Sequence, residues 1–471
     1  MKSVKNNIIY NIIYQLLILI VPILTIPYIS RVLGVDGVGI YSYTYSIVYY
    51  FMIISLLGIN NYGNRVIAQT RDDKYLMSCN FWSIYFIQFI MSILMIIIYF
   101  LYLIIFDIDY KLIAFIQILF IFSAMCDVNW FFFGIEEFKI TITRNGFLKL
   151  LTLIFVFVFI KNENDLWKYT LIMSLMTFLS QLILWPFILK KVYKPSVIHL
   201  SNIKLHFKKC IVLFIPVIAV SLYKIMDKVM LGTIVNVTEL GYYEQAEKII
   251  SVPGAVITAL GTVMLPRITN LVSNKQNKLA LNYIEKSIYL MMFLAFPMMF
   301  GIIITSSKFI PLFLGENFVK SIPLLNLLSI TIIFSSFANV IRTEYLLPNE
   351  NDNVYIISVI IGAIVNFIIN FLLIPKYLGI GACIGTIFAE FIVCYIQSSF
   401  VKDKLPIKKY LNKIMSFFFK SVIMALIIYP IKYLNFNNLV IIILQIVIGI
   451  IIYFVLNIKY IFSILKIKIF K

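Results

Sequence analysis

The sequence predicts an all-α polytopic membrane protein with about fourteen transmembrane helices, arranged as two six-helix lobes followed by two C-terminal helices. Hydrophobic residues make up 62% of the 471 residues, against roughly 45–50% in ordinary soluble domains. Apolar runs of roughly 18 or more residues recur from end to end, and each is long enough to cross a hydrocarbon core about 30 Å thick. Only 13% of the residues are charged, and they cluster between these runs. No segment is long and polar enough to form a separate soluble domain.

The first apolar run is too long for the core of a signal peptide and lacks a small-residue cleavage site, so it is predicted to be a retained helix. The fifth and thirteenth runs are the shortest. The expected spans are 8–29, 38–60, 81–106, 111–134, 147–161, 166–189, 210–234, 246–266, 286–306, 323–347, 354–374, 379–400, 416–433 and 438–465. The predicted domains are an N-terminal lobe at 1–190, a basic cytoplasmic linker at 191–209, a C-terminal lobe at 210–400, and two additional helices at 401–471.

The net charge of +19 is distributed unevenly between the two sides of the predicted membrane. With the N-terminus inside, about 27 Lys and Arg residues lie on the cytoplasmic side and about 8 on the other. This bias predicts a multi-pass protein with both termini in the cytoplasm. The positive charge therefore indicates topology and attraction to anionic membrane lipids, and it does not predict nucleic-acid binding.

A short internal repeat supports the division into two lobes. Leu33-Gly34 follows the first span, and Leu231-Gly232 falls near the end of the seventh. Each pair is followed a few residues later by a glycine and aromatic residues. Both pairs are predicted to mark a tight outer loop, because glycine permits backbone angles that other residues resist.

The seventh span contains ionisable residues that are costly inside a membrane unless they are paired or hydrated. Lys224 and Lys228 are one turn apart, and Asp227 lies between them on nearly the same face. One carboxylate cannot neutralise two ammonium groups, so this turn is expected to carry net positive charge. It is either an anion-binding element facing a water-filled path or a structural ion pair with a snorkelling lysine.

Three other basic residues are weaker candidates for the same path. Lys248 begins the eighth span, Lys149 lies in the fifth, and Arg31 ends the first beside the outer mouth. Each can contact an anionic substrate. Alternatively, Lys248 lies at a solvated helix start, Lys149 snorkels to the cytoplasmic face, and Arg31 meets a lipid headgroup.

One carboxylate in the fourth span is a candidate for coupling. Asp127 is flanked by Cys126 and Asn129 and followed by a run of aromatic residues. It either carries a proton during transport or serves as the partner of a basic residue in the same lobe. The five cysteines are scattered and only two histidines occur, so neither a metal site nor a cofactor is predicted.

Four stretches resemble a known family. They read RVLG at 31–34 with GIY at 39–41, LGI at 57–59 with YGNRVIA at 62–68, DVNWFFFGIE at 127–136 with FK at 138–139, and DKVMLG at 227–232 with ELGYY at 239–243. Here the sequence resembles Wzx-type polysaccharide or oligosaccharide-lipid flippases. These belong to the superfamily that also contains the MATE multidrug exporters and the lipid II flippases such as MurJ.

The resemblance implies a MATE/MurJ-like fold of two helical bundles around a central cavity, operating by alternating access. It implies a bacterial cytoplasmic membrane protein that is not an enzyme. Its cargo would be an undecaprenyl-diphosphate-linked oligosaccharide, carried to the outer leaflet for capsule, O-antigen or exopolysaccharide synthesis. Membrane lipids, a polysaccharide polymerase and the chain-length machinery are the other expected partners.

Two other functions remain open from the sequence. A MATE-like drug/cation antiporter would favour acidic residues in its path, whereas the seventh span is net basic. A membrane glycan polymerase or ligase would need a large outer loop with catalytic residues, whereas the predicted outer loops are short.

Overall fold

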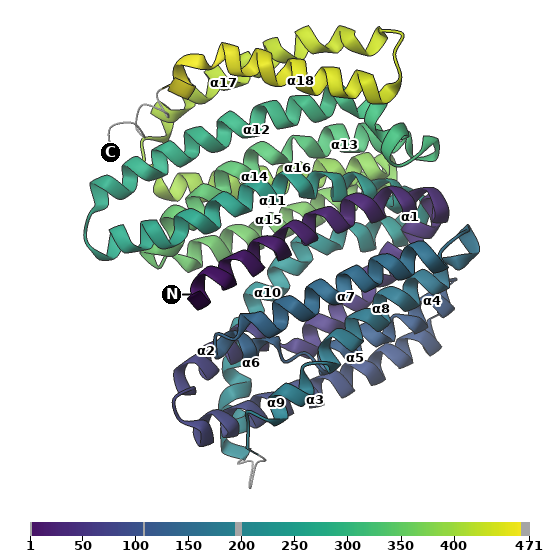
Figure 1. Cartoon of the computed structure of the whole chain (residues 1–471), viewed down its shortest axis with the longest axis vertical. Helices are drawn as coiled ribbons and strands as arrows, with labels where there is room; N and C mark the ends of the chain where they lie inside the picture. Colours follow the sequence, from purple (N-terminus) through teal and green to yellow (C-terminus); the bar gives the residue numbers. More distant parts are fainter. Residues whose placement is uncertain (1, 107–108, 194–199, 463–471) are drawn as a thin grey trace. The chain divides into compact units, whose positions relative to one another are not determined.

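The computed structural model describes residues 2–106, 109–193 and 200–462, with the side chains of the first helix described from Val21 onward. These residues form helices and short connections, without a strand (Figure 1). A helix satisfies all its backbone hydrogen bonds internally, which a chain inside a bilayer requires. The described residues contain 13 helices that are long and apolar enough to cross a membrane. The predicted all-α polytopic fold is confirmed.

The first two expected spans lie in one element, α1 (Lys2–Leu56), which is interrupted at Gly34. Gly34 has φ 68° and ψ −176°, angles that a residue with a Cβ rarely adopts. The turn predicted at Leu33-Gly34 is therefore confirmed. Each of the remaining expected spans falls on one membrane-length helical stretch, and the end of the span expected at 438–465 lies outside the described residues. The two shortest expected spans, 147–161 and 416–433, begin too late in the chain. The helices there are Lys139–Phe159 and Ile407–Tyr433, because each begins with a polar segment before its apolar run.

The chain separates into two compact units, residues 1–232 and 233–471. This division falls within α10, which begins at Leu200. Part of the basic linker predicted at 191–209 lies outside the described residues, so the predicted domain boundaries stay a prediction. The units are described separately below as unit 1 and unit 2.

Unit 1 is a helical bundle in which α1 packs against α3, α5 and α7, while α8 packs against α5 and α7. The fourth span is broken into three short helices, and α2 packs on the last of them, α6. The helices are α1 (Lys2–Leu56), α2 (Ile59–Thr70), α3 (Lys74–Ile105), α4 (Lys111–Ile116), α5 (Ile118–Met125), α6 (Asn129–Gly134), α7 (Phe138–Phe159), η1 (Glu163–Asp165), α8 (Leu166–Leu182), α9 (Trp185–Leu189) and α10 (Leu200–Ile234).

Unit 2 has α12 at its centre, in contact with α13, α14, α17 and α18. The α15 and α16 helices pack along each other, and α16 also contacts α13 and α14. The elements are α11 (Val237–Ser273), α12 (Asn277–Phe313), η2 (Glu316–Phe318), α13 (Ser321–Ser329), α14 (Thr331–Val340), η3 (Ile341–Leu346), η4 (Leu347–Asn349), α15 (Asp352–Tyr377), α16 (Gly379–Val401), α17 (Ile407–Ile428), η5 (Tyr429–Tyr433) and α18 (Asn438–Leu456). The predicted additional helices are therefore α17 and α18, packed on α12.

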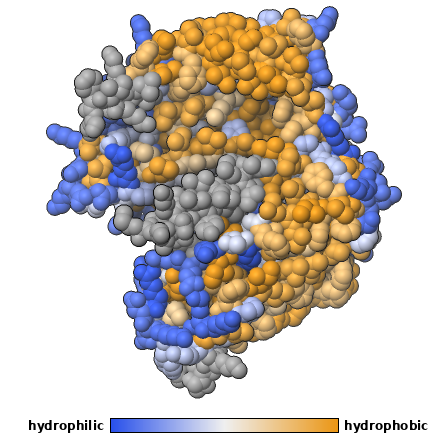
Figure 2. Space-filling view, viewed as in Figure 1, coloured by the Kyte–Doolittle hydropathy of each residue, from blue (hydrophilic) through white to orange (hydrophobic). Residues whose placement is uncertain are grey.

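Large apolar side chains cover much of the surface of both units. Figure 2 shows hydrophobic residues along the lengths of the helices and hydrophilic residues gathered at helix ends. On α3, for example, Ile97, Leu101 and Ile104 are exposed, and on α15 Ile364 and Phe371 are exposed. A soluble protein rarely exposes such continuous apolar surface, whereas lipid chains solvate it. The exposed apolar faces therefore fit a protein surrounded by a bilayer.

Glycines allow α2 and α6 to approach closely in unit 1. A Cβ added to Gly63 would lie 2.5 Å from Trp130 Cε3, and one added to Gly134 would lie 2.7 Å from Ile67 Cβ. Trp130 is fully buried, between Phe81 and the rest of an aromatic core. The ring has no free space into which to move, so the packing depends on the absence of a side chain at Gly63.

Replacing Gly63 with alanine is expected to destabilise unit 1 by about 1–3 kcal/mol, the usual effect of adding a methyl group to a filled core. Thermal unfolding of the purified protein in detergent measures the change. Gly301→Ala is the matched control, because nothing lies within 4 Å of a Cβ added there. It should leave stability unchanged or raise it by up to about 1 kcal/mol, since alanine favours the helix. Equal melting temperatures for Gly63→Ala and the native chain would contradict the packing argument.

Candidate functional site

The α10 helix carries the ionisable turn that the sequence singles out. Because α10 is continuous from Leu200 to Ile234, Lys224, Asp227 and Lys228 lie within about one turn, as predicted. Lys224 is exposed, Lys228 is half-buried, and Asp227 is only 3% exposed. Within the described part of the chain, Lys224 forms no hydrogen bond or ion pair, whereas Asp227 and Lys228 are both engaged by other groups. The turn thus presents a lysine that forms no ion pair with a described carboxylate.

Asp227 is directed toward α1. It lies close enough to the Tyr50 hydroxyl on α1 to act on it electrostatically. The Tyr50 hydroxyl is buried and makes no hydrogen bond with the described residues. The single carboxylate of the ionisable turn is therefore buried against a neighbouring helix, and the exposed side chain of the turn is a cation.

Two contacts of its N-terminal half hold α10 against the rest of unit 1. The Tyr62 hydroxyl and His206 Nδ1 are 2.7 Å apart, and the ring of His206 is buried. Gly58 has a φ of 72° and lies so close to α10 that an added Cβ would be 2.9 Å from the backbone nitrogen of Phe214. These contacts fix the register of α10 before its chain reaches Lys224.

A third contact lies beyond the ionisable turn. A Cβ added to Gly232 would lie 2.1 Å from Cδ2 of Tyr43, so the ring of Tyr43 occupies the place of a side chain on α10. Gly232 is helical, and the connection to α11 comes later, at residues 235–236. The prediction of a turn at Leu231-Gly232 was wrong, because this glycine serves close helix packing. The contacts at Gly58, His206 and Gly232 together fix α10 on unit 1 on either side of Lys224.

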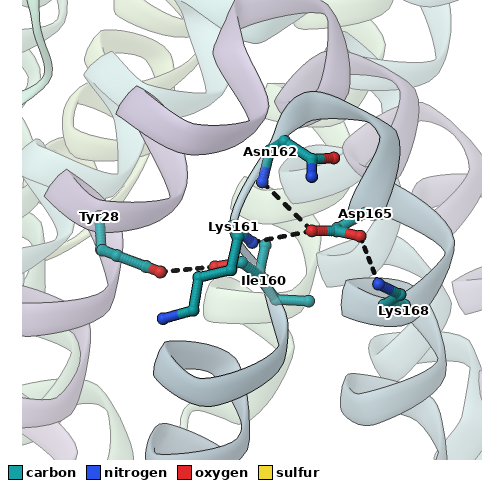
Figure 3. A network of polar contacts seen from close by, with 6 residues as sticks. All are labelled: Tyr28, Ile160, Lys161, Asn162, Asp165 and Lys168. Atoms are coloured by element: carbon teal, nitrogen blue, oxygen red, sulfur yellow. Dashed lines mark hydrogen bonds and ion pairs between the residues drawn. The ribbon is translucent and has the colours of Figure 1, made fainter.

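Arg31 lies on α1 just before the interruption at Gly34, and its side chain is exposed. The neighbouring turn of α1 is fastened to the loop between α7 and α8 (Figure 3). The Tyr28 hydroxyl donates to the carbonyl oxygen of Ile160. In that loop Asp165 accepts from the backbone nitrogen of Lys161 at 2.8 Å and pairs with Lys168 at 2.6 Å. The turn of α1 next to Arg31 is therefore held against the loop between α7 and α8.

The other two basic candidates occupy different surroundings. Lys149 is half-buried in the middle of α7 in unit 1. Lys248 belongs to unit 2, where its Nζ lies 3.0 Å from Oε1 of Glu244, which is 9% exposed. A lysine whose charge is balanced by a buried carboxylate one turn away is less available to an anion. The geometry of Lys248 favours a local ion pair over substrate binding.

Asp127 lies where the fourth span is interrupted between α5 and α6. Its Oδ1 accepts hydrogen bonds from the backbone nitrogen of Asn129 at 3.0 Å and from Asn129 Nδ2 at 2.7 Å. The same amide nitrogen donates to Gln181 Oε1 on α8 at 3.0 Å. A carboxylate with these donors closes the backbone break and links two helices. These bonds favour the structural alternative for Asp127 over a proton carrier.

Arg144 completes this network, and sequence reasoning missed it. Its Nη2 donates to Asn129 Oδ1 at 3.0 Å, and its Nη1 donates to the carbonyl oxygen of Ser180 at 2.8 Å. Arg144 is 7% exposed and lies inside a helix of membrane length. It also acts on Asp127 as a positive charge. The sequence signal that could have pointed to Arg144 was Asp127 itself, because a carboxylate in an apolar span requires a polar or basic partner.

Glu344 in unit 2 was also missed. It lies inside the expected span 323–347, in the π-helical turn η3, and is 0% exposed. Neither of its oxygens makes a hydrogen bond with the described residues. The sequence signal was present, since the residue is acidic and lies within an apolar run.

Comparison with known proteins places these features in a family. Residues 4–272 match the family model described as polysaccharide biosynthesis protein, which is more than half of the chain. The chain belongs to the polysaccharide biosynthesis protein family. A relative in Escherichia coli (strain K12), described as a putative O-antigen transporter, is 22% identical over 407 residues, 85% of this chain and 97% of the relative. The predicted resemblance to Wzx-type flippases is confirmed.

Two solved structures share the fold of this family member. The lipid II flippase MurJ in an inward closed conformation aligns with a TM-score of 0.79 at 17% identity, covering 96% of this chain and 100% of that one. An inward-facing MATE multidrug resistance transporter aligns with a TM-score of 0.59 at 12% identity, covering 82% and 98%. These likenesses establish a MATE/MurJ-like fold.

The stretches that carry the family resemblance meet each other in unit 1. The second and third stretches pair through Gly63 and Trp130. Just past the end of the second, Arg71 forms an ion pair of 2.8 Å with Glu136, and the hydrogen bond to Glu136 raises the pKa of Arg71. The fourth stretch contains Gly232, whose neighbour Tyr43 lies just past the end of the first. These motif residues therefore maintain helix packing, and the exposed Lys224 lies one turn before the start of the fourth stretch.

Proposed function

We propose that this protein is a flippase that moves undecaprenyl-diphosphate-linked oligosaccharide units from the cytoplasmic to the outer leaflet of a bacterial cytoplasmic membrane. The product would serve the synthesis of capsule, O-antigen or exopolysaccharide. The family supports a role in transporting lipid-linked glycans, and the observation that carries the proposal is the exposed Lys224 on α10. The chain would act as a transporter and not as an enzyme.

The chemistry of α10 suits a diphosphate. Lys224 is exposed in a helix of membrane length, and an ammonium group in lipid is costly unless it meets water or an anion. Lys228 lies about 6 Å further along the same helix, and a diphosphate carries charge over a comparable length. Since Asp227 is buried against α1, the exposed part of this turn has a net positive charge. Lysine binds phosphate as a point charge, which tolerates a moving ligand.

The remaining candidates have secondary roles in this proposal. Arg31 would meet the diphosphate or acidic sugars near the outer face, and Lys149 would line the path in unit 1. Both termini would lie in the cytoplasm, as the distribution of Lys and Arg favours. The polyprenyl tail would remain in the bilayer, because it needs no polar path.

A drug/cation antiporter is the second candidate, favoured by the MATE-like fold. An antiporter for organic cations would present carboxylates to its path. In unit 1 the carboxylates of Asp127 and Asp227 are both committed to neighbouring groups, whereas Lys224 is exposed. The charge of α10 therefore favours the anionic lipid-linked glycan.

Deletion of the gene in its own organism distinguishes these functions. The proposed flippase predicts loss of surface polysaccharide and accumulation of the lipid-linked oligosaccharide in the inner leaflet, both restored by the wild-type chain. Mass spectrometry of extracted lipids and surface glycan staining measure the two effects. A deletion strain with normal surface polysaccharide and increased sensitivity to cationic drugs would instead identify an antiporter.

A further inference from the structure

The side chain of Glu344 is a buried carboxyl group to which the described residues supply no counterion. It is 0% exposed, and both of its oxygens lack hydrogen bonds with the described residues. Its neighbours in the chain, Ile341 and Leu346, belong to the apolar core of unit 2. An ionised carboxylate in such surroundings is strongly destabilising unless it is paired, so the neutral, protonated form is favoured here.

The polar group that acts on this carboxyl is the hydroxyl of Ser287 on α12. It lies beside the carboxyl group but outside hydrogen-bonding geometry. A serine hydroxyl can accept from a protonated carboxyl and can donate to an ionised one. A small movement of α12 would therefore let Ser287 stabilise either form.

The basic groups on the elements around Glu344 are directed elsewhere. Arg342 in the same turn donates to Asn339 Oδ1 at 2.7 Å and lies over the ring of Tyr355 on α15. On α11, Arg267 stacks on the ring of Tyr283. On α12, Lys286 lies 5.8 Å from the centre of that same ring. None of these cations neutralises Glu344.

The acidic groups on the packed elements have other surroundings as well. On α12, Glu285 acts on Lys413 of α17 and on Tyr289. Asp352 at the start of α15 is exposed, and Glu390 on α16 is engaged by other groups. The carboxyl of Glu344 is thus an isolated titratable group, and its charge state is controlled by access to water.

The turn that carries Glu344 departs from α-helix geometry. The element η3 is π-helical, and it lies between the α-helical α14 and the 3-10 turn η4. A π-helical turn contains one residue more than α-helix geometry requires, and such turns are frequent at functional sites. Returning this turn to α-helix geometry would rotate Glu344 relative to α12, which changes its surroundings.

We propose that Glu344 is a proton-binding site through which the transport cycle draws on a proton gradient. In the buried conformation the carboxyl group holds a proton. When η3 rearranges and water reaches the side chain, the O–H bond breaks, the proton passes to water, and the carboxylate remains. Reprotonation from water on the other side of the membrane restores the buried form. The coupling part of this inference rests on the proposed flippase function, whereas the proton site does not.

The proton site is tested without any substrate. The full-length protein in lipid nanodiscs is titrated with pH, and the carbonyl stretch of protonated carboxylic acids is followed by infrared difference spectroscopy. The native chain should show a band that disappears as pH rises and shifts in heavy water. Glu344→Gln should lack that band. Glu350→Gln, at an exposed carboxyl just past the same turn, is the matched control and should keep it.

The infrared spectra of Glu344→Gln either support or overturn the proton site. Loss of the band in Glu344→Gln alone supports the site, whereas identical spectra of Glu344→Gln and the native chain overturn it. If Glu344→Gln does not fold, Glu344→Met is measured instead, because an apolar side chain of similar volume suits this core.

Coupling is tested by flipping of lipid-linked oligosaccharide in proteoliposomes with and without a pH gradient. The native chain, Glu350→Gln and Asp127→Asn should all be stimulated by the gradient. Glu344→Gln should flip at a rate that the gradient does not change. An unchanged gradient response in Glu344→Gln would overturn coupling through this residue. If the native chain shows the infrared band but flips nothing, the proposed function fails while the proton site stands.

Discussion

Replacement of both Lys224 and Lys228 with alanine should abolish surface polysaccharide while the protein still inserts into the membrane at its normal level. Lys224 is exposed and no described group neutralises it, so its loss removes a charge available to an anion without breaking a contact. Each ammonium–phosphate interaction in a partly dehydrated path is worth about 1.5–3 kcal/mol. Losing both should lower the rate of flipping by roughly two orders of magnitude or more.

The control for this variant lies on the same helix. Lys204 and Lys208 have the same spacing, are exposed and lie near the beginning of α10. Lys204→Ala with Lys208→Ala changes the net charge equally and should preserve polysaccharide output. Arginine at 224 and 228 should retain much of the activity, whereas glutamate should retain none. Normal output from the double alanine variant would rule out the proposed anion site.

Accessibility of these positions provides a separate measurement. Single cysteines at 224 and 228, in a background without the five native cysteines, should react with a polar thiol reagent. Addition of the lipid-linked substrate should slow the reaction. If neither position reacts from either side of the membrane, α10 does not face water and the proposed path is wrong.

The second large effect is expected at Arg144. Replacement with methionine preserves much of the side-chain volume but leaves Asp127, Asn129 and Gln181 without the guanidinium that joins α6, α7 and α8. Removing one partner from a buried ionic network is destabilising by about 3–5 kcal/mol. Arg144→Met should therefore lower the thermal unfolding temperature of the purified protein sharply and reduce the amount of folded protein in the membrane.

A lysine on the same helix controls for the lost charge. Lys139 lies at the beginning of α7 and is exposed, so Lys139→Met should change the unfolding temperature little. Combining Arg144→Met with Asp127→Asn should recover part of the lost stability, because the second change removes the carboxylate that was left without its partner. A stable Arg144→Met protein would show that the network does not hold these helices together.

The spans could be predicted because hydropathy and length report directly on the lipid environment. A run such as 379–400 must be a helix in a bilayer, since no other backbone conformation satisfies its polar groups there. The turn at Gly34 could be predicted for the same local reason, since only the glycine backbone adopts its angles easily. The turn predicted at Leu231-Gly232 was wrong because the sequence does not distinguish a glycine required for close helix packing from a glycine required for a turn.

The candidate site was only partly predictable. The exposed cation on α10 followed from one-turn spacing, which any α-helix fixes. The partners of Asp127 could not be predicted from the sequence. Arg144 and Gln181 lie on other helices, and nothing in the chain order indicates which helix faces meet. The same holds for Glu344, whose isolation depends on where Arg342, Arg267 and Lys286 are directed.

By itself the sequence determined the membrane environment, the helical fold, the family and the cationic turn of α10. All of these depend on local quantities, namely hydropathy, helical spacing and short motifs. Only the tertiary structure decided which ionisable side chains have hydrogen-bond or ionic partners and which have none. Asp127 has several donors, whereas Glu344 has none among the described residues. The physical reason is that the energy of a charge in a low-dielectric interior is set by groups a few ångströms away, and these come from helices distant in the chain.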